Sequence, residues 1–200
     1  MQSKKAIAKF FALIFCKNVL SHGYLCPHSA GEWRRWLEKN GAAKREIWLL
    51  FPHKNSNLAG ITYLEALEEA LCFGWIDGMV KRYDENHVSS RFSPRANGSS
   101  WSEVNKQHVR LLIAAGKMTP AGSTVLPDLN PTAFPMPEDI LDVLRSDEVT
   151  WKNFCAFPDY YKNIRLAAID RMRSQPEKFH KALNFFLKKT RANGRYGRFR

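Results

Sequence analysis

The residues with the clearest chemical potential lie in segment 75–95, where cations surround one carboxylate. Asp77 is followed by Lys81, Arg91 and Arg95. Ammonium and guanidinium groups that converge on one face can bind a phosphate or carboxylate ligand, while an aspartate orients an arginine among them. A surface salt bridge that fixes strand register, worth about 0 to 1 kcal/mol, accounts for the same residues without any ligand. The ligand-binding interpretation requires these side chains to share one face of the fold.

A hairpin of two strands is expected to position these side chains. After Gly74 the sequence alternates with a period of two, and GMVKRYD and HVSSRFS are predicted as strands joined by a turn at 84–86. A three-residue turn sets three facing pairs, which are Asp77 with Ser93, Met79 with Arg91, and Lys81 with Ser89. Because side chains alternate, one face is expected to carry Asp77, Met79, Lys81, Tyr83 and Arg91. The opposite, buried face is expected to carry Ile76, Val80, Val88 and Phe92.

Catalytic and metal-binding chemistry find less support in the sequence. Asp77 is an unfavourable general acid or base, because three neighbouring cations stabilise its charged form. The sequence contains no GxSxG, HExxH, Walker or GxGxxG motif. His22, Cys26 and His28 are close together but lack a further ligand at zinc-binding spacing. We therefore assign no catalytic residue, expect no metal or cofactor, and keep an enzyme acting on a small anionic substrate as an alternative.

The basic charge of the chain is concentrated at its ends. Residues 161–200 hold twelve Lys or Arg against two acids, within a net charge of +12 for the 200 residues. Such asymmetry indicates contact with an anionic ligand, an anionic surface or nucleic acid, although solvated helix faces account for it as well. The cations expected at such a contact are Lys188, Lys189, Arg191, Arg195, Arg198 and Arg200. No nucleic-acid-binding signature accompanies them, so charge alone supports nucleic acid as a partner.

Capping signals and hydrophobic periodicity predict the elements around the hairpin. Residues 29–42 form a predicted helix that Ser29 caps and Gly41 ends. The capping-box patterns are Thr62 with Glu65, Ser100 with Glu103, and Ser174 with Glu177. In the helix that begins after Thr62, the leucines expected to face the core are Leu64, Leu67 and Leu71. REIWLLFPHK is predicted as a central strand, because both of its faces are apolar.

These elements predict an α+β fold, in which a small antiparallel sheet of about three strands packs with helices and a helical C-terminal module follows. The predicted segments are an N-terminal extension at 1–28, an α+β core at 29–118, a Pro-rich connection at 119–137 and the helical module at 138–200. In the extension, Phe10, Phe11, Ile14 and Phe15 are expected on one face of an amphipathic helix. Lysines interrupt its apolar stretch, so neither a signal peptide nor a transmembrane segment is expected.

The cysteines indicate the compartment. Cys16, Cys26, Cys72 and Cys155 lie far apart and form no CxxC pair. This spacing argues against a disulfide framework or a zinc knuckle and favours the reducing cytoplasm. Cys72 lies in an apolar run and is expected to be a small buried residue rather than a nucleophile.

Several stretches of the sequence resemble the YdeI/OmpD-associated family, also called bacteriocin-protection proteins. They are ALEEALCFGWIDG, RFSPR, SSWSEVNKQHV and LIAAGKMTPAG, within about Gly31 to Gly122, and then DILDVL, YYKNIRLAAID and PEKFHKALNFFLKKTRANGRYG. The resemblance implies a small bacterial-type α+β protein with a helical C-terminal module, loosely similar to the YjbR/CyaY-like group. It also implies a family signature at Trp75, Asp77, Arg91, Phe92, Pro94, Arg95, Trp101 and Asn105.

The resemblance implies no reaction, because the family has no established one and its name rests on associations with stress and antimicrobial resistance. Members have been predicted periplasmic. We therefore expect a non-enzymatic binding protein with an anion-binding surface that serves in stress or antimicrobial-peptide protection. Trp75 and Trp101 suit a planar anionic ligand when cations lie beside them, or else they belong to the core. The candidate ligand-binding residues are Trp75, Asp77, Lys81, Arg91, Arg95, Trp101 and Asn105.

Overall fold

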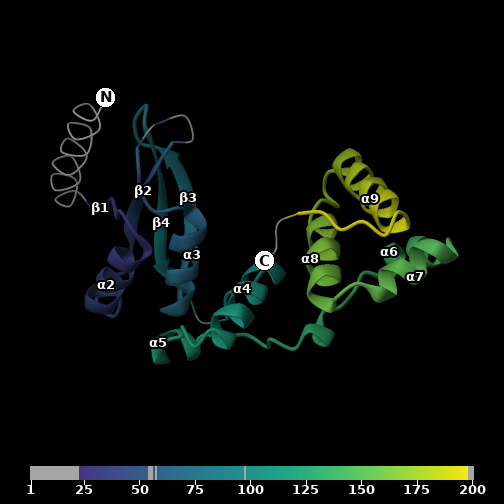
Figure 1. Cartoon of the computed structure of the whole chain (residues 1–200), viewed down its shortest axis with the longest axis horizontal. Coiled ribbons are helices and arrows are strands. Elements are labelled where there is room, and N and C mark those ends of the chain that lie inside the picture. Colours follow the sequence, from purple (N-terminus) through teal and green to yellow (C-terminus); the bar gives the residue numbers. More distant parts are fainter. Residues whose placement is uncertain (1–22, 54–55, 57, 97, 198–200) are drawn as a thin grey trace. The chain divides into compact units, whose positions relative to one another are not determined.

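The computed structural model describes residues 23–53, 56, 58–96 and 98–197, which form two compact units (Figure 1). The first unit consists of the described residues within 1–99 and 108–126, and the second of those within 100–107 and 127–200. The amphipathic helix expected around Phe10 and Phe15 lies outside the described residues. The segment boundaries expected at 28, 118 and 137 stay predictions.

The first unit is built on a four-stranded sheet in the order β1-β2-β4-β3. Its strands are β1 Tyr24–Leu25, β2 Ile47–Pro52, β3 Trp75–Arg82 and β4 His87–Pro94. β1 pairs with β2 in parallel, whereas the other pairs are antiparallel. The predicted α+β class is confirmed, but the sheet is mixed and has one strand more than expected. The two residues of β1 are too few to show a period of two, which is why the sequence pattern missed this strand.

Two helices cover one face of this sheet and enclose the core of the first unit (Figure 1). They are α2 Ala30–Asn40 and α3 Tyr63–Cys72. Trp33 is fully buried, and its ring nitrogen donates to the carbonyl oxygen of Ala66 at 3.0 Å, which ties α2 to α3. Leu49 and Leu50 are both fully buried although adjacent strand residues point to opposite faces. The prediction that this strand is central is therefore confirmed.

Both helices of the first unit's core start at their predicted caps. Ser29 Oγ accepts a hydrogen bond from the N–H of Glu32, and Thr62 forms a full capping box with Glu65. Leu64 is 46% exposed, so its predicted core position is wrong. The first turn of α3 extends beyond the core, whereas the later leucines of the same stripe are buried.

Helices make up the second unit, as predicted. They are α6 Glu138–Arg145, α7 Glu148–Ala156, α8 Asp159–Asp170 and α9 Pro176–Arg191, preceded by the 3-10 helix η2 at Pro131–Ala133. Their shared core contains Ile140, Leu144, Phe154, Leu166 and Phe186. Among the described residues, no helix combines the length and the hydropathy needed to cross a bilayer.

Two of the predicted capping boxes are wrong. Helix α4, Glu103–Ala114, is capped by Ser102 instead of Ser100, and the Ser102 hydroxyl accepts from the N–H of Asn105. Helix α9 has no side-chain cap at its start, where Ser174 was expected to act. Pro176 takes the first helical position instead, because its missing N–H has no partner there in any helix.

Helix α5, Pro120–Ser123, lies within the predicted Pro-rich connection and packs closely against the end of α3. Thr119 Oγ1 donates to the carbonyl oxygen of Cys72 at 2.7 Å. A Cβ atom at Gly122 would lie 2.1 Å from that same carbonyl oxygen. Close backbone approach therefore requires glycine at this position.

We predict that Gly122→Ala lowers the free energy of unfolding by about 1 to 3 kcal/mol, because the backbone must shift to admit the methyl group. Gly31→Ala is the control, since only the ends of two side chains lie within 4 Å of a Cβ there. This control is expected to change stability little or to raise it by up to about 1 kcal/mol, because alanine favours the helix. Urea unfolding followed by circular dichroism measures both changes. Equal effects of the two substitutions would contradict the close approach.

Candidate functional site

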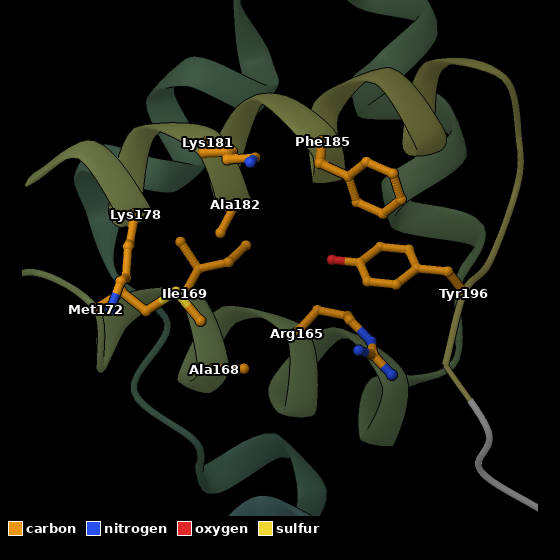
Figure 2. A pocket seen from close by; sticks show the side chains of 9 residues that line it. All are labelled: Arg165, Ala168, Ile169, Met172, Lys178, Lys181, Ala182, Phe185 and Tyr196. Atoms are coloured by element: carbon orange, nitrogen blue, oxygen red, sulfur yellow. The ribbon is translucent and has the colours of Figure 1, made fainter. Parts of the chain in front are cut away.

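A pocket of about 460 Å³ lies in the second unit, between α8 and α9 (Figure 2). The lining residues from α8 and the turn after it are Arg165, Ala168, Ile169 and Met172. The lining residues from α9 are Lys178, Lys181, Ala182 and Phe185. Both sets follow the spacing i, i+3, i+4 and i+7, which places side chains on one face of a helix. Two facing stripes therefore form the walls, and Tyr196 points its hydroxyl into the space between them (Figure 2).

The charged groups around the pocket are all positive. Three of its nine lining residues are cations, and none is a carboxylate. Some of the other cations in this unit are paired with carboxylates, among them Lys162 with Asp159 at 2.8 Å, Arg173 with Asp139 at 2.7 Å, and Arg191 with Asp147 at 3.1 Å. In the part of the chain that the structure describes, Lys178 and Lys181 form no ion pair. Their charge is therefore left for an external anion to neutralise.

Arg165 is held at one end of the pocket by two tyrosine rings. Its guanidinium lies 4.5 Å from the ring centre of Tyr196 and 5.3 Å from that of Tyr161. The N–H of Tyr196 donates to the Tyr161 hydroxyl at 3.2 Å, which places the segment after α9 against α8. Gly197 has a φ of 83°, and a Cβ atom there would lie 2.1 Å from Arg165 Nη2. Burial raises the pKa of Tyr196, so its hydroxyl keeps its proton at neutral pH and can donate to an anion.

The described cations that were predicted to contact an anion lie at or after the end of α9 and do not line the pocket. Lys188, Lys189, Arg191 and Arg195 are exposed, whereas Arg198 and Arg200 lie outside the described residues. Arg191 is neutralised by Asp147, and Lys189 lies 5.6 Å from the ring centre of Phe185. Cations in the last turn of a helix also interact favourably with its terminal carbonyl groups. Contacts within this unit and with the end of α9 therefore account for Lys189 and Arg191 without an external anion.

A β-bulge divides the hairpin that carries the other predicted site. Near the turn the predicted register is confirmed, with Lys81 opposite Ser89. Farther from the turn Asp77 lies opposite Phe92, one residue from its predicted partner. β3 holds one residue more than β4 between these pairs, at 78–79. The predicted pair of Asp77 with Ser93 is therefore wrong, and Arg91 faces both residues of the bulge where Met79 alone was expected.

The bulge places Asp77 on the face of the sheet that α2 and α3 cover. Directly opposite residues of an antiparallel pair share a face, and Phe92 belongs to the core on this face. Asp77 accepts a hydrogen bond from the Tyr63 hydroxyl, with 2.5 Å between the oxygen atoms. Arg95 is 8% exposed, and this burial lowers the pKa of its guanidinium. The negative charge of Asp77 acts in the opposite direction and partly offsets the shift. Trp75 is buried in the core.

Arg91 lies on the opposite face of the sheet, aligned with Trp48 of β2. Its guanidinium pairs with Glu46 at 3.3 Å. The ammonium of Lys81 lies 4.6 Å from the centre of the Trp48 ring, a cation–π contact. The prediction that Asp77 shares a face with Lys81 and Arg91 is wrong, because one extra residue in β3 reverses the side to which Asp77 points.

Three further positions that were predicted for the hairpin site or for the buried face of the hairpin also differ from expectation. Trp101 and Asn105 belong to the second unit. Val80, expected on the buried face, is 59% exposed. This exposure means that the helices leave the hairpin uncovered at this position. Because Asp77 lies on one face of the sheet and Lys81 and Arg91 on the other, the candidate ligand-binding residues of the first unit do not share one face.

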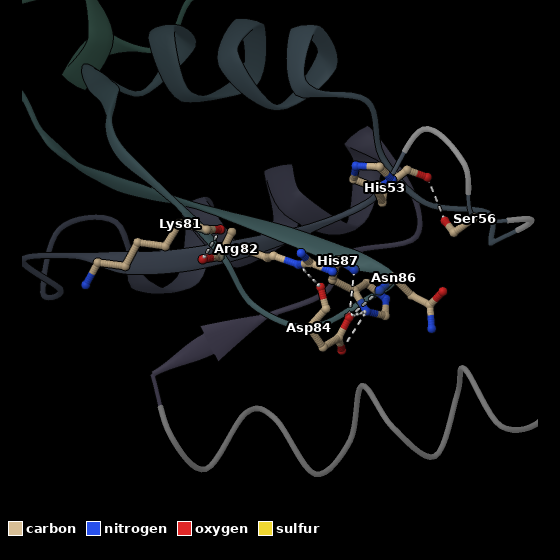
Figure 3. A network of polar contacts seen from close by, with 8 residues as sticks. His53, Ser56, Lys81, Arg82, Asp84, Asn86 and His87 are labelled. Atoms are coloured by element: carbon tan, nitrogen blue, oxygen red, sulfur yellow. Dashed lines mark hydrogen bonds and ion pairs between the residues drawn. The ribbon is translucent and has the colours of Figure 1, made fainter.

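Asp84 fixes the turn at the tip of the hairpin (Figure 3). Its Oδ1 accepts hydrogen bonds from the N–H groups of Asn86 and His87, both at 2.7 Å. The ring nitrogen Nδ1 of His87 lies 3.0 Å from the same carboxylate. Burial alone would raise the pKa of Asp84, but these hydrogen bonds lower it below its ordinary value. The cluster explains why the predicted register holds next to the turn.

The pocket cations Arg165, Lys178 and Lys181 are absent from the candidates that the sequence indicated. A signal was present, because alanine stands between larger side chains in each stripe and cations stand at the stripe ends. The decisive information is which cations have carboxylate partners, and that depends on tertiary packing. Within the described residues, no three His, Cys, Asp or Glu side chains come together to hold a metal ion.

Comparison with known families matches residues 25–125, about half of the chain, to the family described as Domain of unknown function (DUF8412), and the chain belongs to this family. The match covers strands β2 to β4 and helices α2 to α5, and it ends before the pocket. No curated protein and no solved structure matches the chain.

We predict that Tyr63→Phe lowers the free energy of unfolding by about 1 kcal/mol at pH 7, because it removes a hydrogen bond to a carboxylate at a half-exposed position. Burial and then Asp77 raise the pKa of Tyr63 above its ordinary value of 10.0. The contribution is therefore present in full below about pH 10 and is lost as the pH rises through the higher value of the folded state.

Tyr83→Phe is the control for this prediction. Among the described residues its hydroxyl forms no hydrogen bond, and the side chain is 37% exposed. The urea midpoints of unfolding at pH 7 measure both variants, and only that of Tyr63→Phe is expected to fall below the wild-type midpoint. If both variants unfold at the wild-type midpoint, the bond to Asp77 contributes nothing.

Proposed function

We propose that this member of the DUF8412 family is a non-enzymatic binding protein for a small anionic ligand, which lies in the pocket between α8 and α9. The observation that carries the proposal is the combination of three cations, apolar walls and no carboxylate around one cavity. The residues matched to the family end before the pocket, so the proposal concerns this chain and not the family as a whole.

The physical argument rests on charge in an apolar setting. An anion between Lys178 and Lys181 meets ammonium groups that no carboxylate of the described residues neutralises. Apolar walls exclude water from one side of the contact, which strengthens the attraction. A cationic ligand is repelled by the same groups. The pocket is therefore selective for negative charge.

The lining residues favour binding over catalysis. None of them is a histidine, a carboxylate or a cysteine, which are the groups that most often act as general bases or nucleophiles. Tyr196 keeps its proton at neutral pH because burial raises its pKa, so its hydroxyl is neutral and is not an anionic nucleophile. The arrangement of two lysines beside apolar walls suits holding and orienting an anion.

The biological setting is a further part of the proposal. The resemblance to the YdeI/OmpD-associated family supports a role in stress or antimicrobial-peptide protection, and the cysteine spacing favours the cytoplasm as its compartment. A cationic peptide would be repelled by a chain of net charge +12, so an anionic molecule is the better ligand. Nucleic-acid binding through Lys188, Arg195 and the neighbouring C-terminal cations, and an enzyme acting on a small anionic substrate, stay alternatives.

We predict that the chain binds 2-naphthoate but not naphthalen-2-ylmethylammonium, which offers the same aromatic body with the opposite charge. The double variant Lys178→Glu/Lys181→Glu is expected to weaken naphthoate binding at least tenfold, because two attractive charges become repulsive. The control Lys152→Glu/Lys188→Glu changes the net charge equally at exposed lysines of the same unit that do not line the pocket. It is expected to stay within about twofold of wild type, since screening weakens distant charges.

Isothermal titration calorimetry on the full chain measures these affinities, with circular dichroism as the check that each variant is folded. Equal losses in the two double variants, or equal binding of both naphthalene probes, would show that the pocket does not select anions. Tight binding of a DNA oligonucleotide that only the control variant loses would favour the nucleic-acid alternative.

A further inference from the structure

We infer that the natural ligand of this pocket is a monomeric medium-chain fatty-acid carboxylate, with its head group at Lys178 and Lys181 and its alkyl chain between α8 and α9. This inference rests on the proposed function and names the ligand class of the same site.

The shape of the pocket follows from small residues at the centre of both walls. Ala168 on α8 and Ala182 on α9 each stand between larger side chains of their stripe. Where two helices face each other with alanine on both sides, no side chain fills the space between them. Ile169 supplies part of the apolar wall (Figure 2). The result is an elongated apolar space that runs along the helices.

The cations at the two ends of this space differ in the contacts that they make within the protein. Lys178 and Lys181 are one helical turn apart on α9, so their Cβ atoms are about 5 to 6 Å apart and both ammonium groups can reach one carboxylate. Arg165, at the opposite end, already lies over the ring of Tyr196. The carboxylate is therefore placed at the lysine end, and the chain extends toward Phe185.

The length of the space selects the size of the ligand. The seven residue-to-residue steps from Lys178 to Phe185 rise about 10 Å along α9, which is the reach of a medium-length alkyl chain. A cavity of about 460 Å³ accepts one such chain. Acetate or phosphate would pair with the lysines but leave the apolar walls without contacts. Charge complementarity and an apolar path of this length together point to a single-chain carboxylate.

The test compares decanoate, decanol and decyltrimethylammonium at monomeric concentrations by isothermal titration calorimetry on the full chain. Decanoate is expected to bind at least tenfold more tightly than decanol, and the cation is expected not to bind. From hexanoate to decanoate the affinity is expected to rise about fourfold for each added CH2 group. Decanoate is also expected to bind more tightly than 2-naphthoate, because its chain follows the whole length of the space.

A filling variant tests the position of the chain. Ala182→Leu is expected to lower decanoate affinity at least tenfold, because the larger side chain occupies the space. Ala156→Leu makes the same substitution at an exposed residue of the same unit outside the pocket and is expected to have no effect. If Ala182→Leu does not fold, Lys178→Gln/Lys181→Gln replaces it, with the same expected loss.

Several outcomes would overturn the inference. Decanol binding as tightly as decanoate removes the role of charge, and an affinity that does not grow from hexanoate to decanoate removes the role of the alkyl chain. Binding to anionic phosphatidylglycerol vesicles without binding of monomeric decanoate would also refute it. If 2-naphthoate binds through Lys178 and Lys181 while decanoate does not, this inference fails and the proposed function stands. If neither ligand binds, both fail.

Discussion

Alanine at the centre of two facing helical stripes leaves the space between α8 and α9 unfilled by side chains, and the character of the second unit depends on this gap in the packing. Ala168 and Ala182 leave a space of about 460 Å³ where interdigitated side chains would otherwise lie. Walls that face such a space lose dispersion contacts, and within the described residues Lys178 and Lys181 form no ion pair of the kind that neutralises Arg173. An anion with an apolar body supplies both missing contacts. The core that contains Phe154 and Phe186 includes Ile169, which also lines the pocket, so the core and the pocket wall share a side chain.

In the first unit, one extra residue in β3 decides what the hairpin presents. It aligns Asp77 with the core residue Phe92, where the carboxylate accepts a hydrogen bond from the Tyr63 hydroxyl and so stabilises the fold. Lys81 and Arg91 remain on the other face, where an aromatic ring and Glu46 already engage them. The hairpin and the pocket thus contain the same kinds of cation with different surroundings. Internal compensation, not residue type, separates a structural cation from one that is free to meet a ligand.

Features that depend on neighbours in the sequence were predictable, and features set by packing were not. The capping box of Thr62 and the register of Lys81 next to the turn each follow from a few local residues. The bulge was not predictable, because it is coupled to the contact of Asp77 with Tyr63, 14 residues away on another element. The basic character of the C-terminal segment was visible in the sequence. Its division into Arg191, paired with Asp147, and Lys178, which lines the pocket, required the folded structure.

The position of a bound ligand is the most direct test of the proposed pocket. Nuclear Overhauser effects between decanoate and protein whose alanine and isoleucine methyl groups are isotopically labelled give that position. We predict contacts from the alkyl chain to the methyl groups of Ala168, Ile169 and Ala182. Contacts confined to methyl groups of the first unit, such as that of Ala66, or no contacts at saturating decanoate, would contradict the proposal.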